Sequence, residues 1–198
     1  MFFQQAKTNH FLIIGLGNPG KDLEFTRHNT GMLAAKYCID KKGLNPHVHN
    51  NKKIYSQYKQ DKDILWVIPD ININESGRIV KEVLEEYEVA NTNICILYDE
   101  VNMPIGTFKV RYKRGSGGHN GLESIITTLG TRAFVTISIG IGKPSDMSVY
   151  DYVVTRFSDT EYYALLECFE RICGAIECWV NEGREQCQSK YNTARLNK

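Results

Sequence analysis

The sequence has little net charge, no long apolar run and no paired cysteine motif, and each shortage excludes a class of protein. Its 24 Lys and Arg residues almost balance 23 Asp and Glu residues, which gives a formal net charge of +1. Any basic surface must therefore be local. No segment approaches the roughly 20 apolar residues of a membrane span, and polar residues follow positions 1–3 too soon for a signal peptide. We expect a cytoplasmic protein with no membrane partner.

The six cysteines include no CxxC pair, the usual arrangement of a structural zinc site. Cys168, Cys173 and Cys178 are five residues apart, and each step is a rotation of about 140° on a helix, so their thiols do not share a face. We interpret all six cysteines as reduced packing residues and expect no metal.

Apolar runs of strand length alternate with segments of helical periodicity. Strands are predicted near residues 11–16, 64–68, 94–98, 107–112 and 134–141, with a weaker candidate at 54–58. Helices are predicted from Asn29 or Thr30 onward and around 79–87, 122–129 and 165–180. This alternation predicts an α/β fold over residues 1–198: a single-domain three-layer sandwich whose mixed, mostly parallel twisted sheet is flanked by helices. The polar stretch 45–53 is expected to be a surface loop with His47 and His49 solvated.

The stretch FLIIGLGNPG, residues 11–20, places Gly15, Gly17 and Gly20 at the GxGxxG spacing of dinucleotide-binding turns. Such a site needs a helix that starts inside the motif, with its N-terminus at the pyrophosphate. Here the next residues, KDLEFTRHNTG, have no helical stripe. Asp40 has the spacing of a ribose-binding acid, but its surroundings look like a helix end. We therefore do not expect this run to bind a dinucleotide. A tight turn from a strand into a loop is the alternative interpretation of the glycines.

Polar side chains cluster at predicted strand ends and helix starts. They are Asn18, His28, Asn29, Asn74, Asp99, His119 and Asn120. Ligands of α/β sheets collect at these places, so the groups could converge on one site. Singly each has a simpler explanation, since Asn74 and Asn120 suit helix N-caps and Asn18 suits a turn. Together they indicate a functional site.

Several motifs resemble those of bacterial-type peptidyl-tRNA hydrolases, in the same order and spacing. They are GLGNPG…TRHNTG, NESG, YDEVNMPIGTFKVR, GSGGHNGL and ISIGIGKP. The resemblance implies one α/β domain, usually monomeric, that uses no metal or other cofactor and hydrolyses the ester between a peptide and the 3′ end of tRNA. It places the catalytic positions at His28, Asp99, Asn18, Asn74 and Asn120.

These residue types suit ester hydrolysis. Among them, His28 is the candidate base whose ordinary pKa is near neutral, and the resemblance implies that Asp99 accepts a hydrogen bond from its other ring nitrogen. Amide side chains donate and accept without charge. We assign Asn18 and Asn74 to the peptide and the scissile ester, and Asn120 to the water or the carbonyl. Water is the expected nucleophile, because the chain has no nucleophile motif such as GxSxG.

We assign substrate binding to Leu23, Asn72, Ile73, Gly118 and His119. Three of these depart from the family pattern: Leu23 stands where tyrosine is usual, and Asn72 and Ile73 replace phenylalanine and methionine in the wall that receives the peptide. Two further departures are Asn102, where an acid is common, and Ser138, where arginine is frequent. They bear on substrate preference and turnover more than on the class of reaction.

The segment KVRYKRG holds Lys109, Arg111, Lys113 and Arg114. On a strand, Lys109, Arg111 and Lys113 would share one face, which by itself suits a solvated surface equally well. The resemblance implies phosphate contacts with tRNA here, with Lys143 as a weaker candidate. Readout of bases is not expected. Beside the candidate base, Arg27 could serve either structure or substrate.

Two other functions stay open: transfer of the acyl group from tRNA to an amine, and tRNA binding without catalysis. A paired His28 and Asp99 argues against the second, because binding needs no general base. The resemblance also places segment 143–152 over the peptide channel as a cover.

Overall fold

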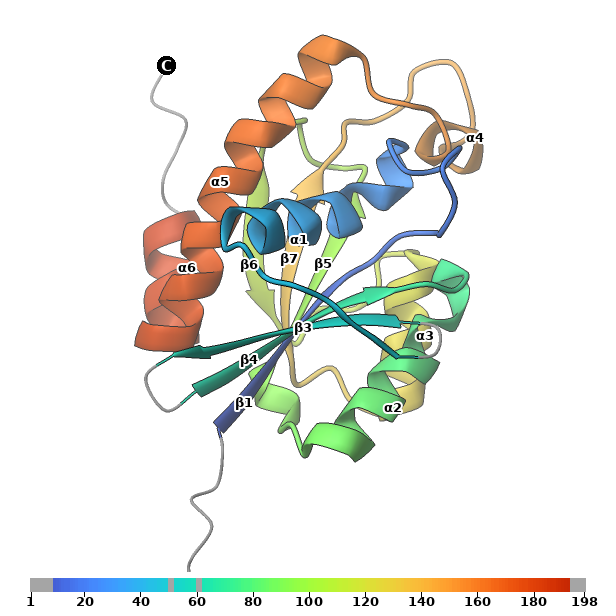
Figure 1. The fold of residues 1–198 in the computed structure, drawn as a ribbon. Coiled ribbons are helices and arrows are strands. Elements are labelled where there is room, and N and C mark those ends of the chain that lie inside the picture. The colour runs from blue at the N-terminus through green and yellow to red at the C-terminus, as the bar shows by residue number, and fades with distance from the viewer. Residues whose placement is uncertain (1–8, 50–51, 60–61, 193–198) are drawn as a thin grey trace, which may run out of the picture.

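A seven-stranded sheet forms the centre of the molecule and has helices on both faces (Figure 1). The computed structural model describes residues 9–49, 52–59 and 62–192. The strands lie in the order β2-β3-β4-β1-β5-β7-β6. Their bounds are β1 (Asn9–Gly15), β2 (His47–His49), β3 (Lys52–Lys59), β4 (Lys62–Pro69), β5 (Ile94–Glu100), β6 (Phe108–Tyr112) and β7 (Val135–Gly140).

Parallel pairing is confined to the four central strands. β1 pairs in parallel with β4 and with β5, and β5 pairs in parallel with β7. The outer pairs, β2 with β3, β3 with β4 and β6 with β7, are antiparallel. Every residue of β7 is buried, as expected for a strand covered on both faces. The predicted fold class, a mixed sheet flanked by helices, is confirmed, and every predicted strand is present.

Two helical layers cover the two faces of the sheet, which gives three layers. One layer holds α2 (Ser76–Tyr87) and α3 (Asn120–Leu129), and the other holds α1 (Thr30–Lys41), α5 (Asp159–Glu182) and α6 (Arg184–Asn192) (Figure 1). Each layer encloses its own hydrophobic core against the sheet, and successive residues of β1 alternate between the two cores. Leu12 lies in the core beneath α2 and α3, whereas Phe11 and Ile13 lie in the core beneath α1 and α5. The short helix α4 (Val149–Val153) precedes α5. Within the described ranges, no helix has the length and apolar character needed to cross a membrane.

The predicted loop at 45–53 is wrong in part, because β2 and the start of β3 lie there. His47 pairs with Ile54 and His49 with Lys52 in an antiparallel ladder. Backbone pairing at the sheet edge overrode a polar composition that by itself suggests a loop. The solvation expected for the side chains of His47 and His49 lies outside what the structure describes.

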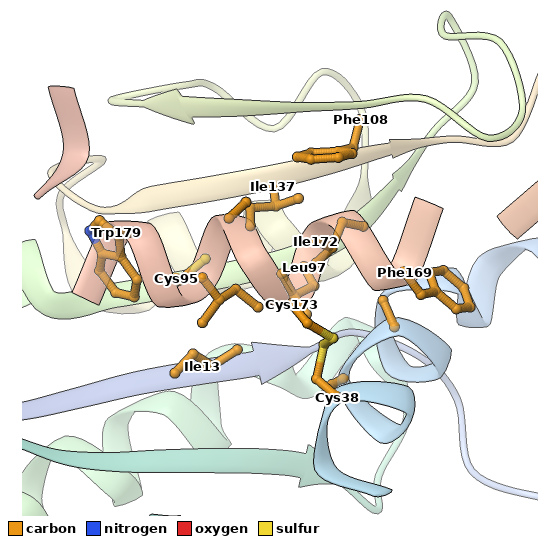
Figure 2. Packing of buried hydrophobic residues seen from close by; sticks show 14 of the residues in the cluster. Ile13, Cys38, Cys95, Leu97, Phe108, Ile137, Phe169, Ile172, Cys173 and Trp179 are labelled. Atoms are coloured by element: carbon orange, nitrogen blue, oxygen red, sulfur yellow. A yellow bond between two sulfur atoms is a disulfide. The ribbon is translucent and has the colours of Figure 1, made fainter. Parts of the chain in front are cut away.

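A disulfide joins Cys38 of α1 to Cys173 of α5, so the prediction of six reduced cysteines is wrong for this pair (Figure 2). The two residues are 135 positions apart in the sequence and meet only because the two helices pack side by side. The other four, Cys95, Cys168, Cys178 and Cys187, are free and buried in the core, as predicted.

Close packing of α1 explains the first glycine of the GxGxxG run. A Cβ atom on Gly15 would lie 2.5 Å from the carbonyl oxygen of Gly31, and one on Gly31 would lie 2.1 Å from that of Leu97. The Met32 N–H donates to the carbonyl of Leu16 at 2.8 Å, which holds the first turn of α1 against the end of β1. Since α1 begins only at Thr30, the run lacks the helix that a dinucleotide site requires.

Replacing Gly31 with alanine is expected to destabilise the protein by about 1–3 kcal/mol, because the added methyl group has no room beside the Leu97 carbonyl. Urea unfolding measures the change. Gly115→Ala is the matched control, since the nearest atom to its Cβ would be 3.9 Å away. Equal losses of stability in the two variants would contradict this explanation.

Candidate active site

A cleft of about 350 Å³ opens at the carboxyl ends of the central strands. Its walls come from the loop after β1, the 3-10 helix η1 (Arg27–Asn29), the 3-10 helix η2 (Ile73–Glu75), the end of β5, the loop before α3, and α4. All five predicted catalytic residues line it, namely Asn18, His28, Asn74, Asp99 and Asn120. The parallel strands thus bring together groups that are far apart in the sequence.

His28 and Asp99 form a hydrogen-bonded pair in this cleft. His28 lies in η1, directly before α1, and Asp99 lies near the end of β5. The His28 Nδ1 atom is 3.0 Å from Asp99 Oδ1. The aspartate side chain is only 3% exposed and the histidine side chain is 16% exposed, and both residues line the cleft. This arrangement leaves Nε2 of His28 available to a substrate or a water.

A second histidine, His119, contacts the same carboxylate oxygen. Its Nε2 is 3.0 Å from Asp99 Oδ1, and its Nδ1 accepts a hydrogen bond from the Leu122 N–H as the N-cap of α3. Because Nδ1 is an acceptor, we assign the ring proton to Nε2, which donates it to Asp99. Neither ring nitrogen is then free for a substrate. His119 therefore holds Asp99 in place; it also lines the cleft, and the substrate contact expected from the sequence stays a prediction.

The electrostatics of the pair favour an ionised aspartate and a basic histidine. Burial lowers the pKa of His28, but the hydrogen bond and charge of Asp99 outweigh burial and raise it above 6.5. Burial raises the pKa of Asp99, yet the His119 and His28 rings hold it well below its usual 3.8. An ionised Asp99 accepts from both rings, which keeps the His28 proton on Nδ1 and the lone pair on Nε2.

Asn18 is fixed in the cleft by two sets of hydrogen bonds. Its Oδ1 accepts from the Ile73 N–H at 2.9 Å. The buried side chain of Asn29 accepts from the Asn18 N–H at 2.7 Å and donates to the Asn18 carbonyl at 2.9 Å. Because Oδ1 is engaged with the protein, the Nδ2 donors of Asn18 are the part of the amide left for a substrate.

Asn74 and Asn120 do not cap helices, contrary to the simpler explanation for them. Glu75 is the N-cap residue of α2, Asn72 caps the short helix η2 before it, and His119 caps α3. Both asparagine side chains are exposed in the cleft and have no hydrogen-bond partner among the residues that the structure describes. Their amides are thus available as donors and acceptors.

Arg27 serves structure, which decides the question that the sequence left open. Its Nε donates to Thr155 Oγ1 at 3.0 Å, and its Nη2 donates to both carboxylate oxygens of Glu161 at 3.0 Å. The guanidinium also lies over the rings of Tyr152 and Phe157, at 4.4 and 4.7 Å from their centres. Arg27 therefore ties η1 to α4, to the first turn of α5 and to the segment between them.

The remaining predicted substrate residues divide between the cleft and its surroundings. Asn72, Ile73 and Gly118 line the cleft, whereas Leu23 lies in the loop after β1 and is not part of its lining. The residues that sequence reasoning missed are Tyr98, Glu100, Val101, Ser116, Gly117, Val149, Tyr150, Val153 and Val154. The last four belong to α4 and its end, and the expected cover at 143–152 was the signal for two of them.

The five predicted tRNA-binding cations lie outside the cleft. Lys109 and Arg111 share one face of the edge strand β6, where buried apolar residues alternate with them as predicted. Lys113 follows the strand in a left-handed backbone conformation, with φ of 56°, so it does not continue that face. Arg114 and Lys143 are exposed in loops. None of these residues has a carboxylate partner within 4.0 Å in the described part of the chain.

His28, Asp99 and His119 form one group of metal-ligating atoms within 4.8 Å of one another, the only such group in residues 9–49, 52–59 and 62–192. The hydrogen bonds argue against a metal there. A neutral ring that binds a metal through Nε2 carries its proton on Nδ1, where the Leu122 N–H already donates to His119. A metal bound to Nε2 of His119 would therefore place a proton on Nδ1 that faces the Leu122 N–H, so that two hydrogen-bond donors would meet.

The sheet, the cleft at its carboxyl edge and the histidine–aspartate pair define an α/β enzyme. The sequence model described as peptidyl-tRNA hydrolase matches residues 12–198. Peptidyl-tRNA hydrolases of Alkaliphilus oremlandii and Clostridium botulinum are 38% and 33% identical to this chain; they cover 91% and 95% of it and 98% of their own length. A crystal structure of peptidyl-tRNA hydrolase from Acinetobacter baumannii has a TM-score of 0.87 at 27% identity and covers 96% of this chain and 97% of its own. This chain belongs to the peptidyl-tRNA hydrolase family.

Proposed function

We propose that this protein hydrolyses the ester between a peptide, or an N-acyl-aminoacyl group, and the 3′ end of tRNA, which frees the tRNA for reuse. The observation that carries the proposal is the His28 Nδ1 to Asp99 Oδ1 hydrogen bond of 3.0 Å in a cleft with available amides. Family membership supports the substrate. An ester to a ribose hydroxyl is already reactive, so the protein needs mainly to activate water and to stabilise negative charge.

In the proposed reaction, Nε2 of His28 takes a proton from water while the water oxygen attacks the ester carbonyl. Asp99 stabilises the imidazolium that forms, and the same proton then passes to the departing 3′ oxygen of the ribose. A positioned base of this kind contributes about 10²–10⁴-fold to the rate. The products are deacylated tRNA and a peptide carboxylic acid, which loses the second proton of the water to solvent, so the step consumes one water and releases one proton.

The cleft amides are proposed to hold the other reacting groups. Nδ2 of Asn18 donates to the peptide or to the oxygen that becomes negative, and one such donor is worth about 10²–10³-fold in kcat. Asn74 holds the peptide near the ester, and Asn120 holds the water or the carbonyl. The apolar residues of α4 and the amide of Asn72 provide the wall that receives the peptide.

Replacing Lys109 or Arg111 with alanine is expected to raise KM for tRNA substrates with little effect on kcat, because both cations lie outside the cleft. Each lost phosphate contact should also reduce the slope of log affinity against log salt by about 0.7–0.9. Steady-state kinetics at several salt concentrations measure both quantities. Lys81→Ala, at an exposed site on α2, is the charge-matched control. An unchanged KM and an unchanged salt slope in both variants would show that this face of β6 is solvated and does not contact tRNA.

Incubation with labelled N-acyl-aminoacyl-tRNA tests the proposed function. Release of the free acyl-amino acid is the expected result. An amide product in the presence of an amine would instead show acyl transfer, and retention of intact substrate would show a tRNA-binding protein without catalysis.

We further propose that the chain acts as a monomeric single domain, with no cofactor, in the cytoplasm, where tRNA and its peptidyl esters are found. Sedimentation of the purified protein with and without deacylated tRNA tests the oligomeric state, and a dimer in both conditions would contradict it.

A further inference from the structure

A second cavity, of about 230 Å³, adjoins the cleft at Asn18, which lines both. Asn18 is the only residue that the two linings share. The walls of this cavity come from the loop after β1, from α1, from β3 and from the end of β4. Neither the proposed catalytic step nor the predicted tRNA surface on β6 uses it.

Three lysines from three different elements line this cavity: Lys21 of the loop, Lys36 of α1 and Lys53 of β3. Lys53 pairs across the sheet with Ile68, which also lines the cavity and belongs to the core beneath α1. The preceding residue, Lys52, points to the opposite face and pairs with Glu82 of α2. The alternation of the strand thus directs Lys53 to the side of α1.

The cavity carries excess positive charge. Lys36 pairs with Glu24 at 2.9 Å, whereas Lys21 and Lys53 have no carboxylate within 4.0 Å among the described residues. Asp70 is the other acid in the lining, so three ammonium groups face two carboxylates. All three lysines line the same cavity as Glu24, and they lower its pKa, Lys36 most and Lys21 and Lys53 less.

The cleft and the cavity that meet at Asn18 are lined by different kinds of side chain. The cleft is walled on one side by Val149, Tyr150 and Val154, which suits a peptide. The neighbouring cavity presents lysines, which suits a polyanion. The ester of a peptidyl-tRNA joins these two kinds of chain, because a peptide lies on one side of it and a ribose with its backbone phosphates lies on the other.

We infer that the cavity beside Asn18 binds a backbone phosphate of the single-stranded 3′ tail of tRNA, held by Lys21 and Lys53. Lys36 adds to the positive field while Glu24 fixes its position. This inference rests on the proposed function, since it takes the ester to lie at Asn18 and His28. Contacts to phosphate carry no base information, so the site fits every tRNA equally.

Binding of deacylated tRNA to the double variant Lys21→Gln/Lys53→Gln tests the inference without any need for turnover. We expect the affinity at low salt to fall about tenfold and the slope of log affinity against log salt to fall by about 1.4, two contacts at about 0.7 each. Each single variant should show about half of the slope change. Because Lys21 and Lys53 are exposed, folding should be unaffected, which thermal unfolding checks. Lys81→Gln is the matched control and should bind like the wild type.

Kinetics with peptidyl-tRNA give a second readout. The double variant should have a raised KM and a kcat within about twofold of the wild type, because binding is lost without loss of the catalytic groups. Glu24→Gln should change KM in the opposite direction, since it removes a negative charge from the lining. Unchanged binding and KM in the double variant would overturn the inference.

Two further outcomes separate this inference from other possibilities. If the KM change appears only with substrates whose peptide carries acidic side chains, while deacylated tRNA binds normally, the cavity receives peptide and the inference is overturned. If the wild type does not cleave peptidyl-tRNA but the double variant still binds deacylated tRNA more weakly, the proposed function fails and the phosphate site stands.

Discussion

His28→Ala is expected to lower kcat for peptidyl-tRNA hydrolysis by about 10²–10⁴-fold and to leave the affinity for deacylated tRNA nearly unchanged. The variant removes the one ring whose nitrogen is free toward the cleft, whereas the cations outside the cleft and the lysines beside Asn18 remain. Single-turnover cleavage measures the first quantity, and fluorescence anisotropy with deacylated tRNA measures the second.

The chain offers a matched control for this change. His10 pairs with Asp63 at 3.4 Å, near the amino end of β1 and outside the lining of the cleft. His10→Ala removes a histidine from a second histidine–aspartate pair and should retain near wild-type turnover. Equal activity of His28→Ala and His10→Ala would remove His28 as the base.

Asp99→Asn is expected to lower kcat by about 10²–10⁴-fold, through loss of charge more than loss of shape. Two N–H groups, from the His28 and His119 rings, meet the same oxygen of Asp99. In the variant the amide oxygen can still accept from both, but a neutral amide does not stabilise the imidazolium that forms when water is deprotonated. If the amide nitrogen faced the rings instead, it would meet two donors.

Asp63→Asn is the matched control, since it makes the same neutral substitution in the pair outside the cleft. Turnover and tRNA affinity should change little in that variant. The account of Asp99 would be contradicted if Asp99→Asn kept wild-type kcat, or if it lost tRNA affinity and turnover together, which would indicate a collapsed cleft.

The sequence predicted the elements well because their apolar patterns are strong. The buried apolar runs of β4, β5 and β7 and the apolar stripe of α5 leave little ambiguity between strand and helix. The edge strand β2 was missed because a short polar strand has no apolar pattern, and only pairing with β3 defines it. The disulfide of Cys38 and Cys173 was missed because it depends on the contact of two helices, which spacing does not encode.

The five proposed catalytic residues of the candidate site were predictable from the sequence, whereas nine other residues of the cleft lining and the hydrogen bonds within the site were not. Polar residues at strand ends and helix starts identified the cleft, since a parallel sheet brings such positions together. The second hydrogen bond to Asp99 was not predictable, because His119 first had to be located as the cap of α3. Likewise the role of Arg27 depends on Thr155 and Glu161, which are distant in sequence.

The pH dependence of kcat/KM for peptidyl-tRNA hydrolysis tests the central claim, that neutral His28 activates water, most directly. The free enzyme's essential groups set this profile. Because Asp99 raises the pKa of His28 above 6.5, activity should fall tenfold per pH unit below a midpoint that lies above 6.5, and this limb should be absent from the residual activity of His28→Ala. A midpoint in the carboxylate range near 4, or a limb that persists in His28→Ala, would contradict the account.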